Sequence, residues 1–177
     1  MLENKAEQEL TAGRIFSKNP IQNVEIMVTI RRAVQDDFEV ILALIKEFSV
    51  FQKTPERVTV TLEEMICGDL FQGFVAETVD KKIIGFASFF YTWYSWSGKA
   101  IYLDDLYVTQ PYRKQAIGKK LLEAVIDLAK KEGCKKVRWQ VSDWNTNAIA
   151  FYKKTGASID KTEVNCDLVI EPAKNDE

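Results

Sequence analysis

The spacing of hydrophobic residues changes several times along the chain, and each change predicts a new element. The stretch EIMVTIRRA (25–33) alternates apolar and polar residues and is rich in β-branched side chains, which is typical of a strand. From 36 to 48 the apolar spacing becomes three and four residues, which predicts an amphipathic helix with Asp36 near its N-cap. Its apolar face consists of Phe38, Ile41, Leu42, Ile45 and Phe48.

A short helix and three strands are predicted next. The helix covers 61–70 and begins with Thr61 and Glu64 at the spacing of a capping box. The three apolar runs that follow are separated by turn residues at 80–82 and 95–98, which indicates an antiparallel meander. The predicted strands are 73–80, 81–94 and 98–108.

The last third of the chain alternates helices and strands. The predicted segments are a helix from Ile117 to Lys131, a strand at 134–142, a helix at 145–156 and one or two strands at 157–172. The order is therefore β-α-α-β-β-β-α-β-α-β-β, which predicts one α/β domain on a mixed sheet. We expect this domain to cover 25–177, after an N-terminal extension at 1–24.

Composition narrows the chemistry. The 177 residues carry a formal net charge of −2 and no histidine. Without histidine there is no Ser-His-Asp triad, Cys-His pair or histidine-ligated metal, so no metal is expected and acid–base chemistry must use carboxylates, Tyr, Lys or Cys. The acidic balance argues against nucleic acid and membrane as partners, and no apolar run approaches the roughly 20 residues that span a bilayer. Three separate cysteines without a CxxC pair indicate reduced thiols and a cytoplasmic location.

The segment from Val108 to Gly118 has the features of a phosphate-binding loop. It follows a strand and opens a helix, where backbone N–H groups lack partners and the helix dipole is positive. Arg113 and Lys119 add positive charge, and Gly118 permits close approach. We expect Ala116 to keep a negative φ, since its Cβ would otherwise be strained. A plain strand–loop–helix connection remains the alternative, and the glycine patterns of Walker A and Rossmann loops are absent.

Several motifs together resemble one enzyme superfamily. Val108-x4-Arg113-x-x-Ala116-x-Gly118 is similar to the acetyl-CoA pyrophosphate loop of GNAT acetyltransferases, with Ala116 in place of the usual first glycine. The segment SDWNTNAIAFYKKTGA, with Asn145 and Tyr152, resembles the helix that follows in that superfamily. The stretches YLDDLYV and YTWYSWSGK are closest to the diamine (spermidine/spermine) and thialysine N-acetyltransferase group. The resemblance covers roughly residues 26–170.

This resemblance implies a fold, a cofactor and an activity. The fold is the GNAT type of α/β fold: a mixed, mostly antiparallel sheet of six to seven strands, flanked by about four helices and splayed at the acetyl-CoA site. The implied reaction moves the acetyl group of acetyl-CoA to a primary amine of a small molecule, either a diamine or polyamine or a thialysine- or lysine-like amine. A homodimer is implied as well.

The resemblance also assigns roles to residues. Backbone groups at the end of the third meander strand would bind pantetheine, the loop would bind the pyrophosphate, and the start of the last helix would contact the cofactor arm. These cofactor-binding residues are Leu106, Tyr107, Val108, Arg113, Lys114, Gln115, Ala116, Ile117, Gly118, Lys119, Asn145 and Ala148. Tyr152 would be the acid that protonates the CoA thiolate, since its ordinary pKa of about 10 keeps it protonated. Its alternative is a core aromatic residue.

Two adjacent carboxylates are the candidates for handling the amine. Side chains alternate along a strand, so Asp104 and Asp105 are expected to point to opposite faces. By resemblance Asp104 binds the amine and takes its proton through water, with Asp105 as the second choice. Ordinary surface solvation of both is the alternative.

The acceptor side departs from the polyamine enzymes. Trp96 corresponds to the group's cleft tryptophan, in an aromatic stretch that could bind an alkylammonium or simply cover the core or a dimer interface. Acidic residues of the polyamine enzymes are replaced by Tyr94 and Gln52, and Lys53 and Arg57 add positive charge. A short diamine, or an amine that also bears a carboxylate, is therefore favoured over spermidine or spermine.

The residues alone do not exclude other functions. A protein lysine or N-terminal acetyltransferase would share the loop and the acid. A non-catalytic CoA-binding module would share the loop but lack a working acid. A nucleotide-binding domain is disfavoured by the missing glycines.

Overall fold

The computed structural model describes residues 27–68, 70–162 and 164–168, and these form one mixed five-stranded sheet in the order β1-β2-β3-β4-β5. Neighbouring strands are antiparallel except β4 and β5, which are parallel. The strands are β1 (Val28–Arg32), β2 (Gln72–Thr78), β3 (Ile83–Tyr94), β4 (Gly98–Val108) and β5 (Lys136–Arg138). The predicted α/β fold with a mixed, mostly antiparallel sheet is confirmed.

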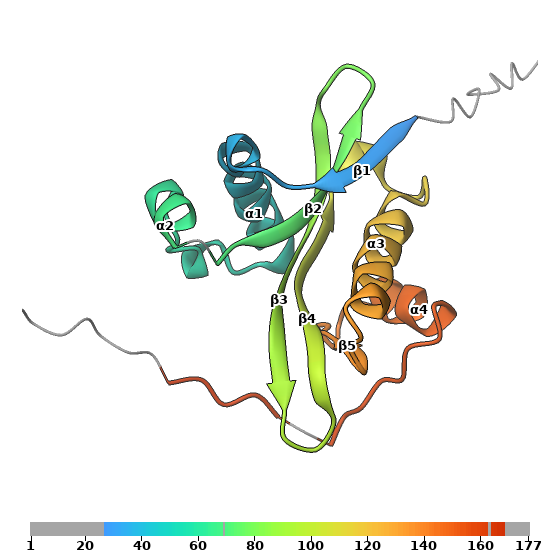
Figure 1. Cartoon of the computed structure of the whole chain (residues 1–177). Coiled ribbons are helices and arrows are strands. Elements are labelled where there is room, and N and C mark those ends of the chain that lie inside the picture. Colours follow the sequence, from blue (N-terminus) through green and yellow to red (C-terminus); the bar gives the residue numbers. More distant parts are fainter. Residues whose placement is uncertain (1–26, 69, 163, 169–177) are drawn as a thin grey trace, which may run out of the picture.

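Helices cover both faces of the sheet. α1 and α2 lie on one side and α3 and α4 on the other (Figure 1). The helices are α1 (Phe38–Gln52), α2 (Leu62–Cys67), α3 (Ile117–Lys131) and α4 (Thr146–Lys154), with short 3-10 turns η1 (Gln35–Asp37), η2 (Pro55–Arg57) and η3 (Gln110–Tyr112). Within the described part of the chain, no helix has the length and apolar character needed to cross a membrane.

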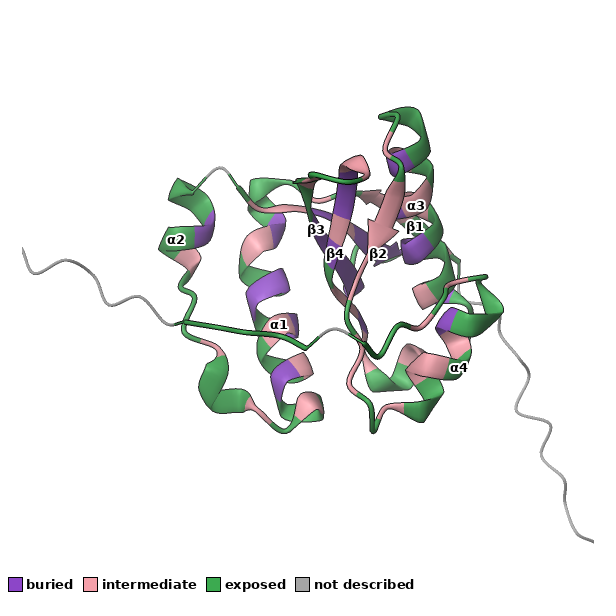
Figure 2. Cartoon of the chain, turned by 90° about the horizontal axis from the view of Figure 1, so that it is seen from below, coloured by how far each residue is buried: buried purple, intermediate pink, exposed green. Residues whose placement is uncertain are grey.

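Each side of the sheet has its own hydrophobic core. The α3 stripe, with Leu121, Leu122 and Val125 fully buried, packs on one face. Ile41 and Leu44 of α1 pack with Phe86 on the other. Figure 2 shows the buried residues on the central strands and on the side of α1 that faces them. The periodicity of α1 therefore predicted the correct buried face.

An ion-pair network fixes the first strand and the entry to α1. Arg31 of β1 donates to both oxygens of Asp37, at 2.6 and 2.9 Å, and to Glu77 of β2 at 2.6 and 2.8 Å. Asp37 also accepts from the Val34 N–H, so the carboxylate tethers the turn before α1. The hydrogen bonds from Arg31 hold the pKa of Asp37 below its usual value.

The strand count is lower than predicted. The stretch expected to form a strand at 134–142 does so only over Lys136–Arg138, and the expected strands in 157–172 are absent from the described residues 157–162 and 164–168. A strand needs a neighbour to satisfy its backbone, and the edge strand β5, beside which a further strand would lie, has only three residues and offers few partners. The remainder of that stretch, and the extension at 1–24, lie outside the described residues.

The loop before α3 has an unexpected backbone. Ala116 is the N-cap of α3 with φ of 59°, and Lys114 has φ of 64°, so both lie in the left-handed region. The expectation of a negative φ at Ala116 was therefore wrong. The chain has to turn from η3 into α3 within four residues, and two left-handed positions achieve that reversal.

The left-handed backbone at Ala116 makes a prediction for stability. A Cβ in this region costs roughly 1–2 kcal/mol, of which the flexibility of an unfolded glycine offsets part. Ala116→Gly should therefore raise the free energy of unfolding by about 0.5–1 kcal/mol, measured by urea denaturation at unchanged m-value.

The matched control is Ala124→Gly in the middle of α3, where the backbone is helical. It should lower the free energy of unfolding by about 1 kcal/mol. Equal destabilisation by both glycines would contradict the left-handed conformation of Ala116.

Candidate active site

A β-bulge in β4 shapes the centre of the molecule. The β3–β4 pairing joins Ala87 to Leu106 but Phe89 to Leu103, so Ser88 stands opposite two residues, Asp104 and Asp105. The Asp105 N–H donates to the Ser88 Oγ at 3.1 Å and satisfies the backbone there. A bulge of this kind changes the alternation of side chains along the strand.

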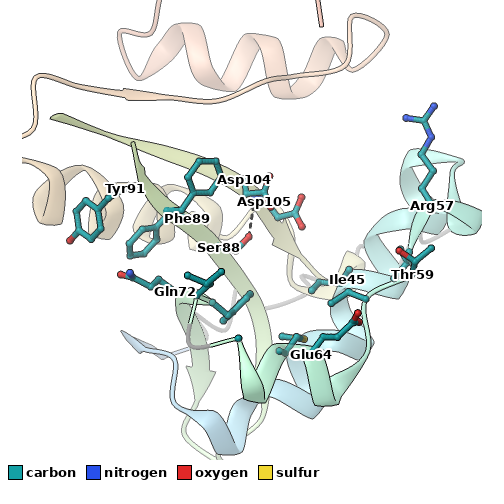
Figure 3. Close-up of a pocket in the computed structure, with 17 residues that line it drawn as sticks. Ile45, Arg57, Thr59, Glu64, Gln72, Ser88, Phe89, Tyr91, Asp104 and Asp105 are labelled. Atoms are coloured by element: carbon teal, nitrogen blue, oxygen red, sulfur yellow. Dashed lines mark hydrogen bonds between the residues drawn. The ribbon is translucent and has the colours of Figure 1, made fainter. Parts of the chain in front are cut away.

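The bulge brings both aspartates to one face. Leu103 and Leu106 both pack in the core beneath α3, although two residues lie between them and regular alternation would put them on opposite faces. Asp104 and Asp105, which lie between them, both line a pocket on the opposite side of the sheet (Figure 3). The expectation that adjacent residues would point to opposite faces was wrong, because the bulge inserts one extra residue in β4.

The pocket has a volume of about 960 Å³ and lies between the sheet and the α1–α2 side. Its wall includes Ile45 of α1, Met65 of α2 and Phe89 of β3, which give it an apolar lining. A smaller pocket of about 360 Å³ adjoins it and shares Asp105 and Arg57 with it. Gln52, predicted at the acceptor site, lines this second pocket and accepts from the Ser142 Oγ at 3.5 Å.

The environment shifts the acidity of the two aspartates. Burial raises the pKa of Asp105 to about 7, and the negative charge of Asp104 adds to this shift. The pKa of Asp104 is raised too, by desolvation, although its side chain stands more open to solvent than that of Asp105. Asp105 is therefore close to half-ionised at neutral pH, which suits a group that accepts and releases a proton.

The far edge of β4 is open where β5 ends. β5 pairs only with Ala100–Tyr102, and β4 continues to Val108. The N–H groups of Asp105 and Thr109 point toward β3, where they meet Ser88 and Ile84. Since backbone direction alternates along a strand, Tyr107 also faces β3, whereas Leu106 and Val108 present their N–H and C=O groups to the open edge. The predicted separation of the central strands is present here.

Arg113 braces the loop against this edge. Its Nε donates to the Val108 carbonyl at 2.8 Å, and its guanidinium lies 4.6 Å from the Phe51 ring centre and 5.2 Å from that of Tyr107. Tyr107 in turn donates to Glu47 of α1 at 2.8 Å. The Arg113 side chain, which was predicted to bind a phosphate, thus contacts Phe51 of α1 and Tyr107 and Val108 of β4.

The remaining loop residues are open. The exposed residues of the loop and the first turn are Lys114, Gln115, Ala116 and Lys119. The N–H groups of the first turn of α3 start at Ile117, directly after the loop. A Cβ on Gly118 would come no closer than 3.8 Å to Val108, which is an ordinary contact. The protein itself therefore does not require glycine at Gly118, and the spare space above it can admit a ligand.

α4 presents Asn145 and Tyr152. The Asn145 Oδ1 accepts from the Ala148 N–H at 3.2 Å, so this side chain is the N-cap of the helix. Tyr152 is buried against Trp139, with ring centres 5.0 Å apart. Burial, with a smaller effect from the Asp105 charge, raises the pKa of Tyr152 to about 12, so its hydroxyl keeps its proton at neutral pH.

Two aromatic and cationic candidates lie apart from the pocket. Trp96 is at the tip of the β3–β4 hairpin with its side chain fully exposed, and it does not line either pocket. The Lys53 ammonium lies 5.5 Å from the ring centre of Trp144. Sequence reasoning missed Ser88 and Glu64 as pocket residues, because Glu64 showed only a capping-box spacing and Ser88 depends on the bulge.

Potential metal ligands do not gather in the described ranges. Among residues 27–68, 70–162 and 164–168, no group of three or more His, Cys, Asp or Glu side chains could hold a metal ion.

Known proteins share both the sequence pattern and the architecture. The chain is 34% identical over 149 residues to the thialysine N-epsilon-acetyltransferase of Bos taurus, covering 77% of this chain and 86% of that protein. It is 34% identical over 139 residues to the human spermidine/spermine N(1)-acetyltransferase-like protein 1, covering 72% of this chain and 20% of that protein. A crystal structure of an aminoglycoside N-acetyltransferase with CoA aligns with a TM-score of 0.64 at 19% identity, covering 81% of this chain and 95% of that chain.

The family assignment follows from one further match. Residues 36–157, which contain the bulge, the open edge of β4, the loop and Tyr152, match the model of the acetyltransferase (GNAT) family. The chain therefore belongs to the GNAT family of acetyl-transferring enzymes.

Proposed function

We propose that this enzyme transfers an acetyl group from acetyl-CoA to a primary amine of a small molecule that binds beside Asp104 and Asp105. The observation that carries the proposal is the bulge, which places two carboxylates in a pocket directly beside the open edge of β4. A pocket with carboxylates attracts an ammonium ion. The relatives named for thialysine and for spermidine/spermine support an amine acceptor.

The residues present fit acetyl-CoA, which is the co-substrate of the GNAT family. The free N–H and C=O groups of Leu106 and the N–H of Val108 can pair with amide groups of a pantetheine arm. The first-turn N–H groups of α3, with Lys114 and Lys119 nearby, can bind a pyrophosphate. When bound, acetyl-CoA would supply the thioester carbonyl that the amine attacks.

Asp105 is the residue best suited to accept the proton of the amine. An alkylammonium has a pKa of about 10.4, which is more than six units above that of an ordinary aspartate. With its pKa raised to about 7, Asp105 lies within about three to four units of it. Asp104, which is more open, then serves to bind the ammonium and to keep the pKa of Asp105 high.

Tyr152 is the residue best suited to donate a proton to the departing thiolate. Its hydroxyl is protonated across the neutral range because burial raises its pKa. Its ring is fixed by Trp139 and Phe151, so the hydroxyl is held in one position. The charge of Asp105 contributes to the raised pKa of Tyr152, which supports a role for both groups in one reaction.

The overall proposal is tested by measuring thiol release from acetyl-CoA in the presence of thialysine, putrescine or spermidine, with an amine-free control. Release with at least one amine supports the proposal. CoA binding without release on any amine contradicts it and favours a protein acceptor or a non-catalytic CoA-binding module.

The role of Asp105 predicts a pH profile. The base works only when ionised, so kcat/KM should rise with pH and level off above the pKa of about 7. Asp105→Asn should remove this rise and lower kcat/KM by about 10²–10⁴-fold.

Asp104→Asn is the matched variant. It removes a neighbouring negative charge that raises the pKa of Asp105, so the midpoint of the rise should move to lower pH. A rise that persists unchanged in Asp105→Asn would assign the base to another group.

The role of Tyr152 predicts a loss of turnover. Tyr152→Phe should lower kcat by at least about 10²-fold with little change in the KM for acetyl-CoA, since it removes only the proton donor. Tyr112→Phe, which removes a hydroxyl outside both pockets, should keep the wild-type kcat. A Tyr152→Phe enzyme within twofold of wild type would rule out the acid role.

A further inference from the structure

Ser88 lies opposite the bulge, and its side chain faces the pocket. Its neighbours in β3, Ala87 and Phe89, both pack in the core beneath α3, so Ser88 points to the other side of the sheet, where it lines the pocket. Figure 3 shows its hydroxyl beside Asp105, with the hydrogen bond from the Asp105 N–H as a dashed line. Ser88, Asp104 and Asp105 therefore bring three oxygen-bearing side chains to one pocket.

The protein uses only part of the hydrogen-bonding capacity of Ser88. A serine hydroxyl offers one O–H donor and two acceptor lone pairs. The Asp105 N–H takes one lone pair at 3.1 Å, and among residues 27–68, 70–162 and 164–168 no other hydrogen bond reaches this hydroxyl. Ser88 is only 6% exposed, and a buried polar group without its partners costs free energy. The unused lone pair therefore favours a hydrogen-bond donor bound in the pocket.

A primary ammonium group matches these three side chains. It carries three N–H donors and a positive charge, and the carboxylates of Asp104 and Asp105 attract that charge and can each accept one N–H. The Ser88 Oγ can accept the third N–H through its unused lone pair. An amine that carries one methyl group on its nitrogen has only two N–H donors when protonated, so it would leave one of the three oxygens without a partner.

We propose that Ser88 binds the ammonium group of the acceptor together with Asp104 and Asp105, and that this third contact makes the enzyme select primary amines over N-methylated ones. This inference rests on the proposed acetyl transfer and adds a residue that determines its specificity. Both kinds of amine can pair with the two carboxylates, whereas only the primary amine has a further N–H for Ser88.

Binding to the enzyme–CoA complex tests this contact, because CoA without an acetyl group cannot react with the amine. The amine is the one among thialysine, putrescine and spermidine that the wild-type enzyme acetylates best. It is compared with the same molecule carrying one methyl group on each nitrogen at the end of a chain. Isothermal titration calorimetry at about pH 8.5, above the pKa of about 7 of Asp105, gives the Kd of each. The measured quantity is the selectivity ratio, which is the Kd of the methylated amine divided by that of the primary amine.

The matched variants are Ser88→Thr and Ser88→Val, which have side chains of equal size and differ in the hydroxyl. The selectivity ratio should be about ten in the wild-type enzyme and in Ser88→Thr, and close to one in Ser88→Val. Thr92→Val removes a hydroxyl from the same strand outside both pockets and should keep the wild-type ratio.

The ratio separates this contact from the structural role of Ser88. Ser88→Val also removes the acceptor of the Asp105 N–H, and a shift of the carboxylates would change both affinities by a similar factor. Such a common change cancels in the ratio. If Ser88→Val unfolds at a lower temperature than the wild-type enzyme, the smaller Ser88→Ala should show the same loss of the ratio.

The outcomes distinguish the inference from the function on which it rests. A wild-type ratio close to one, or a ratio that Ser88→Val leaves unchanged, would overturn the contact with Ser88, while thiol release from acetyl-CoA by the wild-type enzyme would uphold acetyl transfer. If the wild-type enzyme binds CoA but acetylates none of the three amines, both the proposed function and this inference are wrong.

Discussion

The bulge at Asp104 and Asp105 is the constraint on which the rest of the site depends. Without the extra residue, Asp105 would share the face of Leu103 and enter the core beneath α3 as an unpaired charge, which is costly. With it, the apolar residues on both sides of the bulge stay in one core and the two carboxylates reach the pocket. The same insertion sets which backbone groups of β4 face its open edge.

The proposed site joins the two sides of the sheet. The α1–α2 side supplies one wall of the pocket, whereas the α3–α4 side supplies the loop, Asn145 and Tyr152. Arg113 connects them, because its guanidinium packs on Phe51 of α1 while its Nε holds the Val108 carbonyl at the open edge. A change in the position of the end of α1 would therefore reach the loop through Arg113.

Much of the fold could be predicted from the sequence, because local patterns determine it. The apolar stripes of α1 and α3, the capping box at Thr61 and the meander of β2, β3 and β4 all follow from spacing. The fold family could be predicted as well, because its motifs are short and contiguous. The family membership is confirmed, while the roles of the single residues stay predictions.

The sequence did not predict features that depend on distant partners. The face of the sheet on which Asp105 lies depends on Ser88, which is 17 residues away. The left-handed backbone of Ala116 depends on where α3 must start to reach the sheet. The expected last strand would have had only the three-residue β5 as its neighbour. Trp96 lies in the turn that was predicted at 95–98, but its separation from the pocket depends on how the whole hairpin is placed. One signal was present: two adjacent charges inside an apolar strand already argue for a bulge, since regular alternation would bury one of them.

The open edge of β4 also bears on strand pairing between molecules. An unpaired strand edge is a template for strands of other molecules. Here the open stretch is short, its end turns into η3, and the Val108 carbonyl is already occupied by Arg113. A short ligand with a few amide groups can satisfy the remaining groups, whereas a long β-strand would meet too few partners to add stably to the sheet. The short length of this open edge thus limits the addition of a strand from another molecule.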